Sequence, residues 1–184
     1  MEKYTSWIFA ILGMLILVVF VSGCTSSSQN LNKTFSNQGL TFNYPSDWTS
    51  GNFIGQDAVI LTNLTELGVL DSPTGLELTI SQVNLTSIAS NTSVESFKNS
   101  SKTSLINESA QILSDNQTNV NGAIIYAVVY TKNNTSTNKS EKTMIVITGK
   151  DLQNVYIMQF IADPQIFDQN LQIMNKIIAS IKIE

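Results

Sequence analysis

Hydrophobic positions in this chain form one unbroken run near the N-terminus and several short alternating runs after it. Residues 7–20 include no charged side chain, so this apolar run is 14 residues long. That is shorter than the roughly 20 residues of a spanning helix, and it is typical of a signal peptide. The polar residues 25–32 that follow have no helical or strand period and predict a flexible stalk.

After the stalk, apolar and polar residues alternate as they do in strands with one buried face. The first such run is Leu40–Tyr44, and Pro45 begins the turn that ends it. Further runs lie at residues 58–61, 76–81, 110–113, 123–130, 143–148 and 155–161. Asn121-Gly122 predicts a hairpin turn, and the polar residues 131–141 predict a loop within a long hairpin. Trp48 is expected to close one end of the core.

Two segments have helical spacing. Val94, Phe97, Leu105 and Ile106 predict a mid-chain helix between Ser93 and Asn107, with Asn91, Thr92 or Ser93 as its cap. The C-terminal helix has Asp163 as its cap, Pro164 in its first turn, and an apolar stripe that is expected to pack on the sheet. The stripe comprises Phe167, Leu171, Met174, Ile178 and Ile181. Antiparallel strands with two helices predict an α+β sandwich.

The apolar run ends at Val21-Ser22-Gly23-Cys24, which reads as a lipobox. Small residues before a cysteine suit a signal peptidase, and Cys24 is the chain's single cysteine. We therefore expect a signal peptide at 1–23, a lipidated Cys24 and stalk at 24–34, and a domain at 35–184. The alternative is an uncleaved anchor over residues 7–23. Either would tether the domain to the extracytoplasmic face of the cell membrane.

Composition excludes several function classes. All ten basic residues are lysines and histidine is absent, which rules out a Ser-His-Asp triad and an imidazole metal site. A net charge of −4 with scattered lysines argues against nucleic acid as a partner. Asp57, Glu66, Asp71 and Glu77 lack calcium-loop spacing. The single Ser-X-X-Lys, Ser136 to Lys139, lies in the polar loop. We expect no cofactor, no metal and no enzymatic activity.

Asn-X-Ser/Thr occurs ten times, where chance predicts about four. The excess suits an external protein that carries N-linked carbohydrate, although clustering of Asn, Ser and Thr in loops is the alternative. The candidate acceptors are Asn32, Asn63, Asn84, Asn91, Asn99, Asn107, Asn116, Asn133, Asn134 and Asn138.

Residues 42–48, preceded by Gly39, resemble the opening strand and turn of the PsbP-like family. Tyr156, Phe160 and residues 177–181 resemble its last strand and helix. The similarity covers about residues 35–184 and extends to the lipid-anchored archaeal members. It implies an α/β/α sandwich around an antiparallel sheet of about six strands, and an accessory or binding module. The family's histidine metal ligands and its photosynthetic partner have no counterpart here.

These patterns lead to two hypotheses about function. The first is a membrane-tethered lipoprotein that serves as a non-catalytic interaction or assembly module and meets a protein partner at the cell envelope. The second is a small-ligand binding protein whose pocket lies near Trp48, with tyrosines such as Tyr44, Tyr126, Tyr130 and Tyr156 as candidate lining residues. A deep pocket would favour the second, and an exposed apolar patch over a filled core would favour the first.

Overall fold

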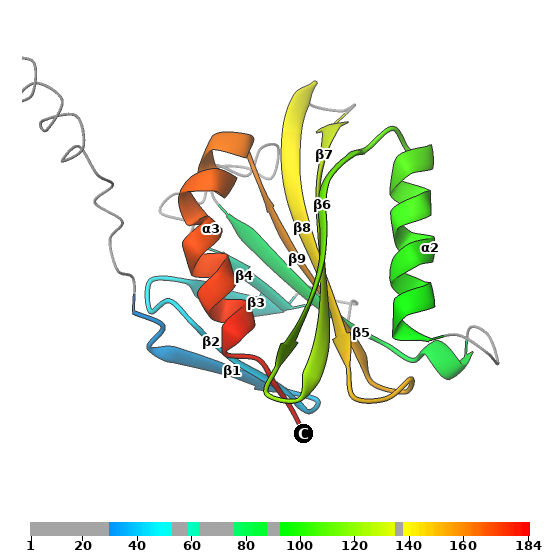
Figure 1. Ribbon diagram of the computed structural model, residues 1–184. Coiled ribbons are helices and arrows are strands. Elements are labelled where there is room, and N and C mark those ends of the chain that lie inside the picture. The colour runs from blue at the N-terminus through cyan, green and yellow to red at the C-terminus, as the bar shows by residue number, and fades with distance from the viewer. Residues whose placement is uncertain (1–29, 53–58, 63–75, 88–92, 135–137) are drawn as a thin grey trace, which may run out of the picture.

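The computed structural model describes residues 30–52, 59–62, 76–87, 93–134 and 138–184, which form an α+β fold with two antiparallel sheets (Figure 1). The expected signal peptide, Cys24 and residues 25–29 of the expected stalk lie outside the described residues. The strands are β1 Lys33–Asn37, β2 Leu40–Tyr44, β3 Thr49–Asn52, β4 Val59–Thr62, β5 Glu77–Val83, β6 Gln111–Val120, β7 Ala123–Asn134, β8 Lys139–Gly149, β9 Val155–Ala162 and β10 Lys182–Ile183. The helices are α2 Val94–Asn107, α3 Pro164–Ala179 and the short 3-10 helix η1 Leu85–Ser87.

The larger sheet has seven strands in the order β3-β4-β5-β9-β8-β7-β6, and every neighbouring pair is antiparallel. It is therefore one strand larger than the expected sheet of about six. β8 and β9 lie at its centre, where both faces are covered, so the run from Thr143 to Thr148 is buried without a break. Successive residues of β8 still alternate between the two faces, because the side-chain period of a strand is two.

Each face of this sheet carries a helix, so the described residues form three layers (Figure 1). On one face Met158 and Phe160 of β9 join a core cluster with Phe167 and Met174 of α3. The three-stranded sheet β1-β2-β10 packs into the same cluster. On the other face the second cluster includes Ile145 and Ile147 of β8, against which α2 packs. The expected α/β/α layering thus has a second small sheet beside α3.

α3 begins and ends where local sequence signals place it. Asp163 accepts a hydrogen bond from the backbone N–H of Gln165, Pro164 occupies the first turn, and the helix ends at Ala179. The predicted stripe is wrong at Leu171, which is 38% exposed, whereas Ile173 and Ile177 are buried. α3 contacts both sheets, so its buried surface is wider than a single stripe and is turned toward Ile173 and Ile177.

α2 confirms the predicted mid-chain helix, and Ser93 is its cap. The Ser93 hydroxyl accepts from the N–H of Ser96, and the Ser96 hydroxyl accepts from the N–H of Ser93. Its apolar face is narrow, with Val94, Phe97 and Leu105 only partly buried. The prediction is wrong at Ile106, which is 54% exposed. Lys98 is the residue of α2 that is buried.

The strands β6, β7 and β8 form a continuous meander that is longer than the alternating runs predict. Asn121 and Gly122 have φ angles of 50° and 86°, so they form the expected two-residue turn with left-handed backbone at both positions. The predicted loop at 131–141 is much shorter, because β7 continues to Asn134 and β8 starts at Lys139. The hairpin itself is confirmed.

The sequence patterns did not predict three short strands, β1, β3 and β10. Lys33 and Thr34, placed at the end of the expected stalk, are the first residues of β1. β10 pairs with β2, and the backbone N–H of Glu184 donates to the carbonyl of Gly39. The C-terminus therefore lies against the first hairpin of the domain (Figure 1). In the described part of the chain, no helix has the length and apolar character needed to cross a membrane.

Candidate functional site

The most concentrated charge in the described residues joins α2 to β6. Lys98 Nζ lies 3.1 Å from Asp115 Oδ1, and Lys102 Nζ lies 2.5 Å from Asp115 Oδ2. Lys98 also sits 5.5 Å from the centre of the Tyr126 ring. The hydrogen bond from Lys102 is the main cause of a lowered Asp115 pKa, and Lys98 lowers this pKa further. Asp115 thus stays ionised and links helix to strand, which is a structural role.

Other ionisable groups form isolated contacts. Lys142 of β8 pairs with Asp168 of α3 at 2.6 Å, and Lys132 pairs with Glu108 at 2.6 Å. Burial raises the pKa of Glu77, and the charge of Glu141 raises it further. No group of three or more acidic or cysteine residues converges within the described ranges. Asp57, Glu66 and Asp71, the acidic residues nearest to Glu77 in sequence, lie outside those ranges, as does Ser136.

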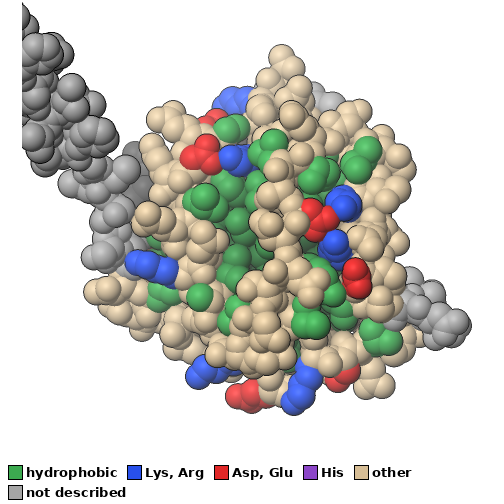
Figure 2. All heavy atoms as spheres, in the orientation of Figure 1, with side chains coloured by type: hydrophobic (Ala, Val, Ile, Leu, Met, Phe, Trp, Pro, Cys, Tyr) green, Lys and Arg blue, Asp and Glu red, His purple; other side chains and the backbone are tan. Residues whose placement is uncertain are grey.

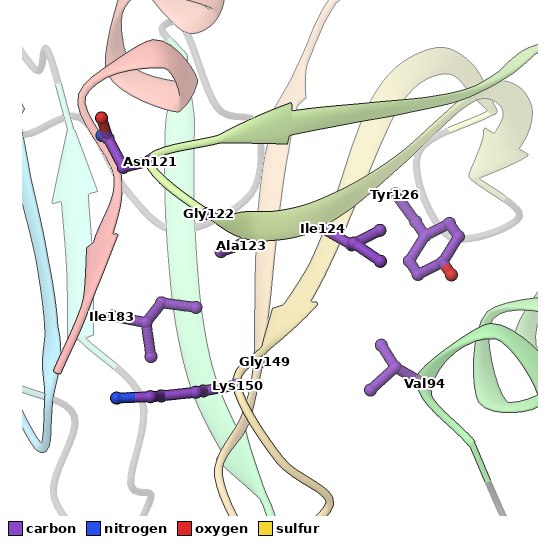
Figure 3. A pocket seen from close by; sticks show the side chains of 9 residues that line it. All are labelled: Val94, Asn121, Gly122, Ala123, Ile124, Tyr126, Gly149, Lys150 and Ile183. Carbon is purple, nitrogen blue, oxygen red and sulfur yellow. The ribbon is translucent and has the colours of Figure 1, made fainter.

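An open cavity of about 450 Å³ lies between the β6–β7 turn, the end of β8 and the start of α2. Ile124 and Val94 supply apolar surface, Lys150 supplies a cation, and the Tyr126 ring closes one side (Figure 3). Ile183 of the short strand β10 lines the opposite side. Such a volume is in the range of small-ligand sites. An anionic, partly apolar molecule matches this lining, although Asn121 points away from the cavity to the carbonyl of Ile181.

The aromatic residues expected to line a groove near Trp48 have different environments. Trp48, Tyr44 and Tyr156 are buried in the core cluster beside α3. The Tyr156 hydroxyl donates to the carbonyl of Gln38, so this tyrosine fixes the first hairpin. Tyr126 is the one of this set that lines the cavity of about 450 Å³. Residues 53–58 and 63–75, which follow Trp48, are outside the described ranges.

An apolar surface borders β6 on the side of α3. Partly buried Val120, Ala127 and Val129 belong to the cluster on this face of the sheet, and Leu171 of α3 is exposed. Figure 2 shows hydrophobic side chains gathered in the hollow between α3 and the front strand. We call Val120, Ala127, Val129 and Leu171 the α3-side apolar surface. Leu171 is the exposed member of this set, and the three strand residues are partly buried beside a filled core.

The candidate carbohydrate acceptors that the structure describes with side chains are all exposed. They are Asn32, Asn84, Asn99, Asn107, Asn116, Asn133 and Asn138. Asn63 and Asn91 lie outside the described residues, and the side chain of Asn134 is not described. Exposure is necessary for modification, so these seven positions remain candidates.

Sequence reasoning missed both the Lys98–Asp115–Lys102 cluster and the cavity beside Lys150. Asp115 is 13 and 17 residues from its two partners, and helical spacing alone gives no sign of which strand α2 covers. The α2 spacing of Lys98 and Lys102, one turn apart, was the available signal. The cavity depends on the approach of β10, a strand of two residues.

The model of the family described as PsbP-like protein matches residues 21–183. None of the curated proteins matches the chain. Among solved structures, a Pseudomonas aeruginosa protein of unknown function, PA94, is 12% identical with a TM-score of 0.53, over 83% of this chain and 96% of that one. Cyanobacterial PsbP (CyanoP) from Synechocystis sp. PCC 6803 is 15% identical with a TM-score of 0.52, over 88% and 98%.

A protein from Bacteroides thetaiotaomicron VPI-5482 is 15% identical with a TM-score of 0.53, over 84% of this chain and 49% of its own. At these identities the three structures show a shared fold.

Proposed function

The chain belongs to the PsbP-like family, and from this premise we propose that it is a membrane-tethered extracytoplasmic lipoprotein that acts as a non-catalytic interaction or assembly module at the cell envelope. The observation that carries the tether is Val21-Ser22-Gly23-Cys24 directly after the apolar run. A lipid on Cys24 holds the domain close to the membrane, because residues 25–32 span at most about 28 Å when fully extended.

The interaction role is supported by surface rather than by catalytic groups. Asp115, Glu108 and Asp168 are paired with lysines, and without histidine the chain has no imidazole to act as a base near neutral pH. The α3-side apolar surface offers a docking area beside a core that is filled by Phe160, Phe167 and Met174. An exposed apolar patch of this kind commonly marks a protein–protein contact.

Mass measurement of the mature N-terminus in native membranes tests the tether. We expect a chain that begins at Cys24 and carries added acyl or alkyl mass. Cys24→Ser is expected to lose both the cleavage and the lipid mass, whereas the matched variant Ser22→Ala keeps a small residue before the cysteine and is expected to retain both. An unmodified wild-type chain with Met1 intact would falsify the proposal and favour an uncleaved anchor.

Affinity capture from crosslinked native membranes tests the interaction role. We expect one envelope protein to be recovered with the wild-type chain, and its yield to fall when Leu171 and Val129 on the α3-side apolar surface are changed to Asp. Ile106→Asp is the matched control, because Ile106 is also exposed but lies on α2. Equal yields from all three samples would contradict docking at this surface.

Binding of a small anionic ligand is the second candidate, and the cavity beside Lys150 is the observation that favours it. An anionic aromatic dye such as anilinonaphthalene sulfonate is a suitable probe. Its fluorescence is expected to fall in Lys150→Met and to remain in Lys176→Met, because Lys176 lies in the last turn of α3. Equal fluorescence in both variants would remove this candidate.

A further inference from the structure

The outer edge of β6 is a row of backbone groups that has no ladder partner among the described residues. β6 is the last strand of the seven-stranded sheet, and β7 is its neighbour. Residues 115–119 are all exposed. β6 lies at the front of the molecule, and no described element covers it on the side nearest the viewer (Figure 1). The strand includes neither proline nor lysine, the residues that commonly protect an edge from pairing.

The β6–β7 turn determines which backbone groups point outward. In a hairpin with a two-residue loop, the residues that flank the loop, Val120 and Ala123, exchange hydrogen bonds, and every second pair does the same. The backbone groups of Asp115, Gln117 and Asn119 consequently point away from β7. The bulge at Leu113 interrupts this alternation, so it limits the regular free edge to these three residues.

We propose that β6 is a homotypic interaction surface, where it pairs antiparallel with β6 of a second copy and joins two seven-stranded sheets into one. A two-fold axis at Gln117 places Gln117 opposite its own copy and Asp115 opposite Asn119 of the second copy. All three outward residues then lie in hydrogen-bonded pairs. If the axis moves by one residue in either direction, either Asp115 or Asn119 is left without a hydrogen-bonded pair in the second copy.

Charge selects the same arrangement. An axis at Asp115 would place two Lys98–Asp115–Lys102 clusters, each with an excess of positive charge, opposite each other, which is unfavourable. With the axis at Gln117, Asp115 faces an amide instead. Asn119 accepts the N–H of Gly122 through its side-chain oxygen at 3.1 Å, so its NH₂ group remains to donate. Figure 2 shows a band of uncharged polar side chains and backbone along the front of the molecule, with charged side chains at its border.

The geometry also suits two copies on one membrane. A two-fold axis for antiparallel pairing within a sheet runs perpendicular to the sheet, so both copies present α3 on the same side. Leu31, near the start of the described chain, packs against the core cluster on that side. Both N-terminal ends would therefore leave the same face. This pairing goes beyond the proposed tether and does not require it, although a shared membrane would raise the local concentration of the two copies.

Disulfide crosslinking of the full-length chain in native membranes tests the register. Gln117→Cys is expected to give a species at twice the mass of the monomer in the same membranes on mild oxidation, because Cα atoms in a hydrogen-bonded antiparallel pair are about 5.5 Å apart. Ser114→Cys is the matched control, since it would lie about 20 Å from its own copy. Both variants retain Cys24, so the wild-type chain gives the background. Equal dimer in Gln117→Cys, Ser114→Cys and wild type overturns the proposal.

Sedimentation of the detergent-solubilised full-length chain provides a measurement without new cysteines. The wild-type mass is expected to rise toward twofold with concentration. Gln117→Lys should abolish the rise because two ammonium groups meet at the axis, whereas Ser114→Lys should retain it. Material with an unmodified Asn116 is used, because carbohydrate there would cover the α3-facing side of β6. A wild-type chain that remains monomeric at every concentration, or an equal rise in both variants, overturns the proposal.

Discussion

Two lysines of α2, Lys98 and Lys102, pair with Asp115 of β6, and the contribution of each pair to stability depends on its burial and on its distance. Lys102 approaches more closely, at 2.5 Å against 3.1 Å for Lys98. The Lys98 side chain is the more buried, at 10% exposed against 30%. Exposed ion pairs contribute about 0.2–1 kcal/mol, while loss of one partner from a fully buried pair costs about 3–5 kcal/mol. The side chain of Asp115 is 26% exposed, so its pairs lie between these limits.

We predict that Asp115→Asn lowers the free energy of unfolding by about 1–2 kcal/mol, mainly because Lys98 then keeps a largely buried charge without a counterion. In double-mutant cycles with Lys98→Met and Lys102→Met, the coupling of Lys98 to Asp115 is expected to be about 1 kcal/mol, and that of Lys102 below about 0.5 kcal/mol. Methionine retains most of the apolar length of lysine, so packing changes little.

Chemical denaturation followed by far-UV circular dichroism measures these free energies, and its pH dependence gives a second check. The folded-state pKa of Asp115 is lowered, so the stabilisation is complete above the ordinary aspartate pKa of about 3.9 and is lost as pH falls through the lowered value. The wild type and Asp115→Asn should therefore converge in stability only at acidic pH. A larger coupling for Lys102 than for Lys98 would refute the reasoning that burial outweighs distance.

The core, the turn and the surface lead to three further predictions. Phe167→Ala should lower the free energy of unfolding by about 3–5 kcal/mol in thermal or denaturant unfolding, because Phe167 is buried in the core. Leu171→Ala on the same helix should lower it by less than about 1 kcal/mol. Similar losses in the two variants would show that the buried face of α3 is misplaced. Gly122→Ala should cost about 1 kcal/mol because of the φ angle of 86°, and an unchanged midpoint would contradict this. Enzymatic deglycosylation should lower the intact mass of native material, and Asn99→Gln should reduce that shift; an unshifted wild-type mass would remove the carbohydrate prediction.

Sequence patterns predicted the elements whose determinants are local. Ser93 and Asp163 mark the starts of α2 and α3 because capping groups bind backbone within the next three residues. The alternation in β5 and the apolar runs of β8 and β9 reflect the burial of their side chains, so the sequence patterns predicted these strands correctly. β1 and β10 were missed because each depends on β2, and β10 lies about 140 residues from it in sequence. Two-residue strands leave no period to detect.

The position of Leu171 shows why a helical period predicts a face only approximately. At about 100° per residue, Leu171 lies near one edge of the buried arc of α3, whose centre falls between Met174 and Ile177. The predicted stripe follows the residues that repeat every three or four positions from Phe167, and it omits Ile173 and Ile177. Contact with the three-stranded sheet, which no pattern along the chain predicts, widens the arc toward those residues.

The polar composition of β6 explains why hydrophobic alternation predicts only the start of this strand, and it also supports the proposed pairing of β6 with a second copy. Alternation predicted a strand only at residues 110–113, because from Asp115 to Asn119 the residues on both faces are polar and exposed. A strand with two polar faces cannot be held by burial, so backbone bonds to β7 and the lysine contacts of Asp115 hold it in place. Its other edge retains the same bonding capacity. The polar character of both faces therefore explains why the hydrophobic pattern does not predict most of β6, and the same character suits β6 to bind another strand through its backbone.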